Sequence, residues 1–172
     1  ACTACGDGYY CPAGSSHPIP ASCDAGTFLP AGVVFANQSA CSQCPMGSWC
    51  AGGQTPPKSC SAGAFSNQTG LTSCVDCAAG RFQDAVDATA CTTCIAGHFQ
   101  ALTAQTSCTQ HTKCVVGEFE TQPPNVTHDR VCAPCPTGQY QDAGAATSCK
   151  ACETCDSGPR DKCGGAFAGV CP

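Results

Sequence analysis

The feature that most constrains the fold is a short motif, Cys-x-x-Gly-x-aromatic, that recurs along the chain. It occurs eight times in 172 residues, and in six cases a polar stretch leads on to a further cysteine. Four of these stretches contain 13 residues and two contain 17. Such internal repetition predicts a tandem array of small units, each touching only its neighbours. The motifs begin at Cys5, Cys23, Cys44, Cys60, Cys77, Cys94, Cys114 and Cys135.

The composition indicates that cysteines must hold these units together. Leu, Ile, Val and Phe make up only about 12% of the chain, below the roughly 20% associated with a folded apolar core. The chain has 21 cysteines, and a disulfide that closes a ring of about 15 residues contributes roughly 3 kcal/mol. We therefore expect a small disulfide-rich fold, an elongated tandem array with short β-strands, irregular loops and almost no helix. It would be secreted or extracellular, at the cell surface, where disulfides persist.

Each part of the motif has a physical role. The glycine permits a positive-φ turn after the cysteine, and the aromatic residue begins a short extended segment beside the disulfide. The polar tract that follows returns the chain to the closing cysteine; we call it the return loop. The spacing predicts a first long unit at 1–41, a second at 42–76, two simple 17-residue repeats at 77–108, an extended-loop repeat at 109–134, and a last module at 135–172.

Charge and chain ends exclude several classes of protein. The net charge is −5 and the seven Lys and Arg residues are scattered singly, so no nucleic-acid surface is expected. No apolar run is long enough to span a bilayer. Because the sequence starts at Ala1 without a methionine, we expect a processed product or a segment of a longer chain.

No pattern in the sequence favours catalysis. Cys-x-x-Cys pairs can bind zinc or perform redox chemistry, but here they link one repeat to the next and lack a strand and helix around them. The histidines have unrelated spacings and are expected to be solvated loop residues: His17, His98, His111 and His128. We expect no enzyme activity, no cofactor and no metal.

The last part of the chain carries a resemblance to a known family. The segment CPTGQYQDAGAATSC, followed by KAC, ETC, DSGPRDKC and GGAFAGVC, resembles a cysteine-rich module of the tumour-necrosis-factor-receptor and ephrin-receptor-like type. The preceding segment PPNVTHDRVCAPC is similar to the end of many such modules. In this family a single-loop half precedes a half with two crossed bridges. The resemblance therefore implies Cys135–Cys149, and Cys152–Cys163 crossed with Cys155–Cys171.

The remaining cysteines are expected to follow the same scheme. Cys2 is left over from the odd total, and its partner is expected upstream in a longer chain or in a neighbouring chain. The other expected pairs are Cys23–Cys41, Cys60–Cys74, Cys77–Cys91, Cys94–Cys108 and Cys114–Cys132, with Cys5–Cys11 and Cys44–Cys50 in addition.

Three sequons suggest covalent glycans. Asn37, Asn67 and Asn125 each begin an Asn-x-Ser/Thr tripeptide, the acceptor pattern of N-glycosylation in secreted proteins. All three precede a closing cysteine, in the part of a repeat expected to be most exposed. We expect all three to be N-glycosylated.

Two functions fit these observations. The first is an extracellular structural or adhesive rod, a glycosylated subunit or segment of a filament, coat or flagellar hair that associates with itself or with other structural subunits. Its bias toward small residues and its scarcity of lysine resemble surface and filament repeat proteins of algae and protists. The alternative is a receptor-like ectodomain that binds a protein ligand. Residues outside the repeat that could anchor a ligand are Tyr9, Phe35, Phe167, Arg81, Arg130 and Arg160.

Overall fold

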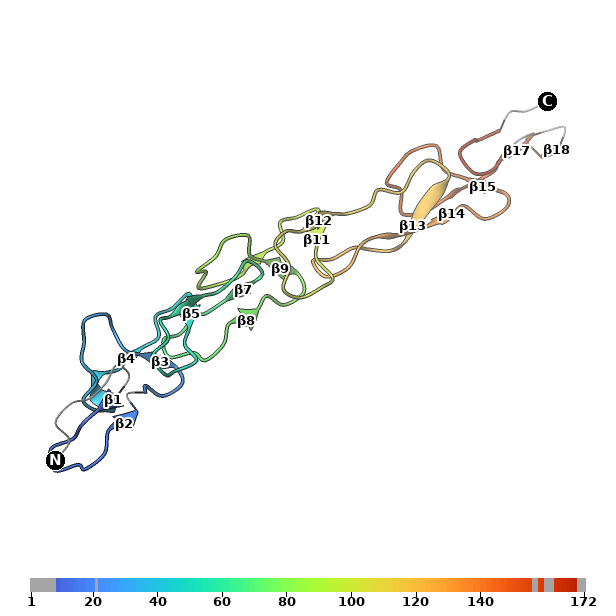
Figure 1. The fold of residues 1–172 in the computed structure, drawn as a ribbon. Coiled ribbons are helices and arrows are strands. Elements are labelled where there is room, and N and C mark those ends of the chain that lie inside the picture. Colours follow the sequence, from blue (N-terminus) through green and yellow to red (C-terminus); the bar gives the residue numbers. More distant parts are fainter. Residues whose placement is uncertain (1–8, 21, 156–157, 160–162, 170–172) are drawn as a thin grey trace. The chain divides into compact units, whose positions relative to one another are not determined.

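The fold is a succession of small β-hairpins (Figure 1). The structure is a computed structural model that describes residues 9–20, 22–155, 158–159 and 163–169. In these ranges the strands form two-stranded antiparallel sheets, and the helical structure is a 3₁₀ turn, η1 (Gln38–Ala40). The predicted fold class, a disulfide-rich tandem array with short strands and almost no helix, is confirmed.

Nearly all of the strands are two residues long. In chain order, β1 (Tyr9–Tyr10) pairs with β2 (Ile19–Pro20), β3 (Thr27–Phe28) with β4 (Ser42–Gln43), β5 (Ser48–Trp49) with β6 (Lys58–Ser59), β7 (Ala64–Phe65) with β8 (Val75–Asp76), β9 (Arg81–Phe82) with β10 (Thr92–Thr93), β11 (His98–Phe99) with β12 (Thr109–Gln110), β13 (Glu118–Gln122) with β14 (Val131–Pro134), β15 (Gln139–Tyr140) with β16 (Lys150–Ala151), and β17 (Thr154–Cys155) with β18 (Gly158–Pro159).

The cysteines and glycines of the motif shape each hairpin. The motif glycine has a positive φ, +84° at Gly26 and +88° at Gly63, and the first strand begins directly after it. The carbonyl of this glycine accepts a hydrogen bond from the residue that follows the second strand, as Gly63 does from the amide of Cys77 at 2.9 Å. The glycine thus turns the chain into the hairpin and also fixes where the hairpin ends.

A second set of backbone bonds joins each hairpin to the next. The residue four places before a closing cysteine has a positive φ, and its amide donates to the carbonyl of a cysteine in the preceding unit. Asp87 donates in this way to Cys60 at 3.0 Å, and Ala104 donates to Cys77 at 2.9 Å. Gly70 and Ala145 make equivalent bonds. The return loop of one unit is therefore bonded to the cysteine of the unit before it.

Contacts within the array also reach the second neighbour. A Cβ placed on Gly63 would lie 2.3 Å from the carbonyl oxygen of Ala104, two units further along. Gly26 is as close to Gly70, and Gly47 is close to Asp87. The expectation that each unit touches only its neighbours is therefore wrong, because the return loops are long enough to cross the intervening hairpin.

The chain divides into two compact units. The first contains Ala1–Thr93 with Leu102–Ser107, and the second contains Cys94–Ala101 with Cys108–Pro172. The five-part division inferred from the spacing stays a prediction.

The buried residues are mostly half-cystines. Cys44, Cys50, Cys60 and Cys77 are fully buried, and large aliphatic side chains are exposed along the described part of the chain. A small aromatic cluster forms in the first unit, where Phe35 is buried and its ring centroid lies 5.1 Å from that of Tyr10. Phe35 is therefore a core residue and not a spare ligand anchor.

Eight disulfides join described cysteines, each in a pair that the sequence and the resemblance predicted. Cys11 is also disulfide-bonded, while Cys2, Cys5 and Cys171 lie outside the described residues, as does the side chain of Cys155. The predicted Cys5–Cys11 and Cys155–Cys171 bridges therefore lie outside the described part. The eight pairs are Cys23–Cys41, Cys44–Cys50, Cys60–Cys74, Cys77–Cys91, Cys94–Cys108, Cys114–Cys132, Cys135–Cys149 and Cys152–Cys163.

The second-neighbour contact predicts different costs for two equivalent glycines. Gly63 and Gly97 occupy the same motif position with φ of +88° and +84°, but only at Gly63 would a Cβ meet another backbone. Gly97→Ala should cost about 1–2 kcal/mol, the left-handed strain alone. Gly63→Ala should cost about 1–3 kcal/mol more because of the overlap. Denaturant unfolding of the two oxidised variants measures the difference, and equal losses would contradict the contact.

The connectivity predicts a specific peptide map. After proteolysis of the unreduced protein within the return loops, the fragments should stay joined through Cys60–Cys74, Cys77–Cys91 and Cys94–Cys108 until they are reduced, because each cut lies inside a disulfide-closed ring. Mass spectrometry before and after reduction identifies the linked pairs. A bond within a Cys-x-x-Cys pair, such as Cys74 to Cys77, would contradict this connectivity.

Candidate functional site

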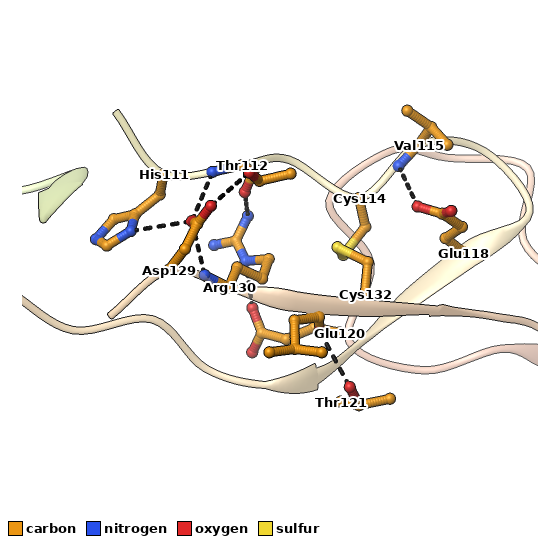
Figure 2. Close-up of a disulfide and its surroundings, with 11 residues drawn as sticks. His111, Thr112, Cys114, Val115, Glu118, Glu120, Thr121, Asp129, Arg130 and Cys132 are labelled. Atoms are coloured by element: carbon orange, nitrogen blue, oxygen red, sulfur yellow. Dashed lines mark hydrogen bonds and ion pairs between the residues drawn. A yellow bond between two sulfur atoms is a disulfide. The ribbon is translucent and has the colours of Figure 1, made fainter. Parts of the chain in front are cut away.

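The polar side chains concentrate around the β13–β14 hairpin. Its strands are the longest of those described, with five and four residues, and the register shifts between Glu120 and Gln122. The Cys114–Cys132 disulfide joins β14 to the segment before β13, and the loop between the strands covers residues 123–130. Figure 2 shows the side chains that gather here.

The carboxylate of Asp129 organises the segment before β13. Its Oδ1 accepts hydrogen bonds from the backbone amides of Thr112 at 2.8 Å and of Arg130 at 2.7 Å. Its Oδ2 accepts from the Thr112 hydroxyl at 2.5 Å (Figure 2). One side chain thus fastens the end of the loop to residues 17 positions earlier in the sequence.

These bonds stabilise the charged form of Asp129. The hydroxyl of Thr112 is the largest cause, and together with the two backbone amides it lowers the pKa of the Asp129 carboxyl from 3.8 to about 2. A depressed pKa means that the folded state gains stability from this carboxylate above about pH 4, and that this gain is lost as the pH falls toward 2.

The side chain of Arg130 joins the same loop to β13 and to the segment before it. Its Nε donates to Glu120 Oε2 at 2.5 Å, and its Nη1 donates to the carbonyl of Thr112 at 3.2 Å. Both charged side chains are largely covered, with 21% of Arg130 and 16% of Glu120 exposed. Arg130 therefore has partners within the chain, which makes it a structural residue and not the free ligand anchor considered from sequence.

Two histidines also pack within the structure. The His111 side chain is only 11% exposed, and its ring stacks on Phe99 with centroids 5.3 Å apart. Its Nδ1 lies 3.4 Å from Asp129 Oδ1, a distance that gives an ion pair when the ring is protonated. His98 belongs to β11. The expectation of a solvated loop residue is therefore wrong for His111, whose ring is covered, while His98 lies in a strand and not in a loop.

A surface hollow lies beside this cluster. It has a volume of about 310 Å³ and is lined by Ile95, His98, Asn125, Val126 and Arg130 among other residues. Asn125 stands at its edge in a tight turn, where its Oδ1 accepts from the amide and the hydroxyl of Thr127, each at 2.8 Å. The Asn125 amide nitrogen lies 2.7 Å from His128 Nε2.

Apolar side chains remain exposed on the same part of the chain. Ile95 is 68% exposed, and Val115 and Val116, at the turn that leads into β13, are 60% and 51% exposed. Within the described ranges there is no cluster of His, Cys, Asp or Glu able to hold a metal ion. No helix in those ranges has the length and apolar character needed to cross a membrane.

The sequence predicted part of this arrangement. Asn125 was identified by its sequon, and the segment PPNVTHDRVC was singled out by its resemblance to the end of receptor modules. The bond from Thr112 to Asp129 was missed, because no spacing rule joins two residues on different arms of an irregular hairpin.

The Asp129 cluster predicts a linked titration. Thr112→Val removes the hydroxyl that contributes most to the low pKa, so the Asp129 pKa should rise toward 3.8. Carboxyl-carbon NMR measures this pKa, and Asp142, whose pKa is lowered by Lys150, serves as an internal control that should not move. Acid unfolding of the variant should show less loss of stability between about pH 4 and 2. An unchanged Asp129 pKa would contradict the assignment.

Comparison with known proteins gives the following likenesses. The chain has no match among curated proteins. Among solved structures, a chain of the human RANKL/OPG complex is 17% identical with a TM-score of 0.31, over 83% of this chain and 82% of that one. A chain of the mouse RANKL-OPG complex is 18% identical with a TM-score of 0.36, over 83% of this chain and 98% of that one.

A family model matches the part of the chain that contains the Asp129 cluster. The match covers residues 94–132, from the first cysteine of the Cys94–Cys108 ring to the second cysteine of the Cys114–Cys132 ring, and the family is the TNFR/NGFR cysteine-rich region. The match is to the same type of cysteine-rich repeat as the resemblance found in the sequence. Residues 94–132 are therefore similar to the TNFR/NGFR cysteine-rich region.

Proposed function

We propose that this chain is a receptor-like extracellular module that binds a protein ligand through residues 94–132. The observation that carries the proposal is the match of these residues to the TNFR/NGFR cysteine-rich region. Eight disulfides among the described cysteines support a place outside the cell, where disulfides persist.

The matched region has the physical properties of a binding platform. The disulfide Cys114–Cys132, the carboxylate of Asp129 and the Arg130–Glu120 ion pair hold the hairpin in one conformation. A rigid surface loses little conformational entropy on binding, which favours affinity. The cluster thus stabilises the hairpin, and recognition is left to exposed side chains.

The exposed pair Val115 and Val116 is the proposed contact. Both side chains are more than half exposed although they are apolar, and they stand at the turn between Cys114 and Gly117. The Glu118 carboxylate accepts a long hydrogen bond from the Val115 amide, 3.4 Å, which steadies the turn. Apolar side chains on a rigid turn gain from burial against a partner.

The hypothesis of a structural rod has less support. A filament subunit needs a surface for self-association, whereas the family match is to a cysteine-rich region of receptors. We therefore place the receptor-like function, which was the alternative reading of the sequence, ahead of the rod.

Two matched substitutions test the proposal. The full chain is first screened against displayed secreted proteins and ectodomains, and any binder is measured with purified protein. Val116→Asp should then weaken binding at least about tenfold, the effect of about 1.4 kcal/mol, because it places a charge in an apolar contact. Val86→Asp is the control, since Val86 is also exposed, at 61%, but lies outside residues 94–132.

Two outcomes would contradict the proposal. Equal loss of affinity in both variants would place the contact elsewhere. A chain that binds no protein and forms regular filaments in electron microscopy would overturn the receptor-like function in favour of the structural rod.

A further inference from the structure

The three sequons lie on exposed loops of the folded chain. Asn37, Asn67 and Asn125 are exposed, and each lies between the two strands of its hairpin unit, outside the strands themselves. A glycan at any of them would leave the strand pairing and the eight disulfides undisturbed. We propose that all three carry N-linked glycans, and that the first sugar at Asn125 rests in the hollow beside Ile95 and Val126.

The local geometry at Asn125 leaves its amide nitrogen available. The side-chain oxygen accepts from Thr127 and from the His128 amide, so the tripeptide itself holds the oxygen inward. The nitrogen has one contact in the structure, His128 Nε2 at 2.7 Å. An asparagine amide has two hydrogens. One can be replaced by a sugar while the other still donates to His128.

The transfer itself uses ordinary chemistry. The donor is an oligosaccharide carried on a lipid pyrophosphate in the secretory pathway. A bond forms between Asn Nδ2 and the anomeric carbon, the bond from that carbon to the pyrophosphate oxygen breaks, and one amide proton leaves. The charge of the chain does not change.

The hollow explains why the first sugar at Asn125 would be held. Its volume is about 310 Å³, and Asn125 is part of its lining. Ile95 and Val126 offer aliphatic surface to the C–H face of a sugar ring, while His98 and Arg130 offer polar groups to its hydroxyls. Ile95, 68% exposed, would lose much of its contact with water.

Asn67 has a similar position in the first unit. It borders a hollow of about 470 Å³ that Phe65, Val75 and Arg81 also line. Asn37 lies in neither lining, although it shows the same local turn, with the amide and hydroxyl of Ser39 donating to its side-chain oxygen. Seating of the first sugar is therefore proposed for Asn125, whose own side chain lines a hollow.

Occupancy is tested on the full chain secreted from eukaryotic cells. Release of glycans by an amidase converts each occupied asparagine to aspartate, which peptide mass spectrometry detects. Conversion is expected at Asn37, Asn67 and Asn125. An unconverted Asn125 overturns the proposal, and so does an Asn125 whose peptide carries no glycan before release.

Seating of the first sugar is tested by a pair of variants at Thr127. Thr127→Ser keeps the sequon and the hydroxyl, and Thr127→Ala removes both. The difference in Tm between the two variants is measured for protein from eukaryotic cells and for protein from an oxidising bacterial periplasm, where neither is glycosylated. In the bacterial protein, the Tm difference between the variants reflects only the lost hydroxyl bond. The amount by which the difference in the eukaryotic protein exceeds it is the contribution of the glycan.

The Tm difference in the eukaryotic protein should exceed the difference in the bacterial protein by a few degrees, which corresponds to about 1 kcal/mol in a chain of this size. Trimming the Thr127→Ser glycan to its first sugar should leave the Tm unchanged, because that sugar fills the hollow. No excess, or a trimmed protein as unstable as Thr127→Ala, would overturn the seating. None of these measurements involves a ligand, so the result is independent of the proposed receptor-like function.

Discussion

The ring-closing disulfide is the interaction on which the rest of this structure depends. Large aliphatic residues are scarce and mostly exposed, and the fully buried side chains among the described residues are mainly half-cystines. A two-residue strand pair cannot persist alone in water. It persists here because a disulfide closes each such unit and so limits the conformations that the chain can adopt.

Backbone hydrogen bonds then convert separate rings into an array. A cysteine carbonyl in one unit accepts the amide of a positive-φ residue in the next, as in the Ala104–Cys77 bond. The carbonyl of this residue also lies against a motif glycine two units earlier in the chain, as that of Ala104 does at Gly63. The glycine is thus required twice, for its φ and for the absence of a Cβ.

The proposed contact and the proposed glycan at Asn125 both lie where the regular repeat changes. The β13–β14 hairpin has longer strands than its neighbours, and its loop is held by the side chains of Asp129 and Arg130 in addition to the backbone bond from Gln100 to Val126. This rigid but irregular hairpin offers exposed valines on one turn and a sequon beside a hollow. A protein contact and a glycan can therefore occupy different parts of residues 94–132.

Cysteine spacing by itself predicted the disulfide-rich array and its repeating unit, because the Cys-x-x-Gly-x-aromatic motif recurs at nearly constant intervals. The disulfide pairs of the last module were implied by the family resemblance. The sequence also identified Asn125 through a local tripeptide. Only the tertiary structure decided that Phe35 is buried, that His111 stacks on Phe99, and that Asp129 accepts the Thr112 hydroxyl. These contacts join residues whose separation follows no period. They arise from how irregular loops fold back over the hairpins, which a repeat pattern does not encode.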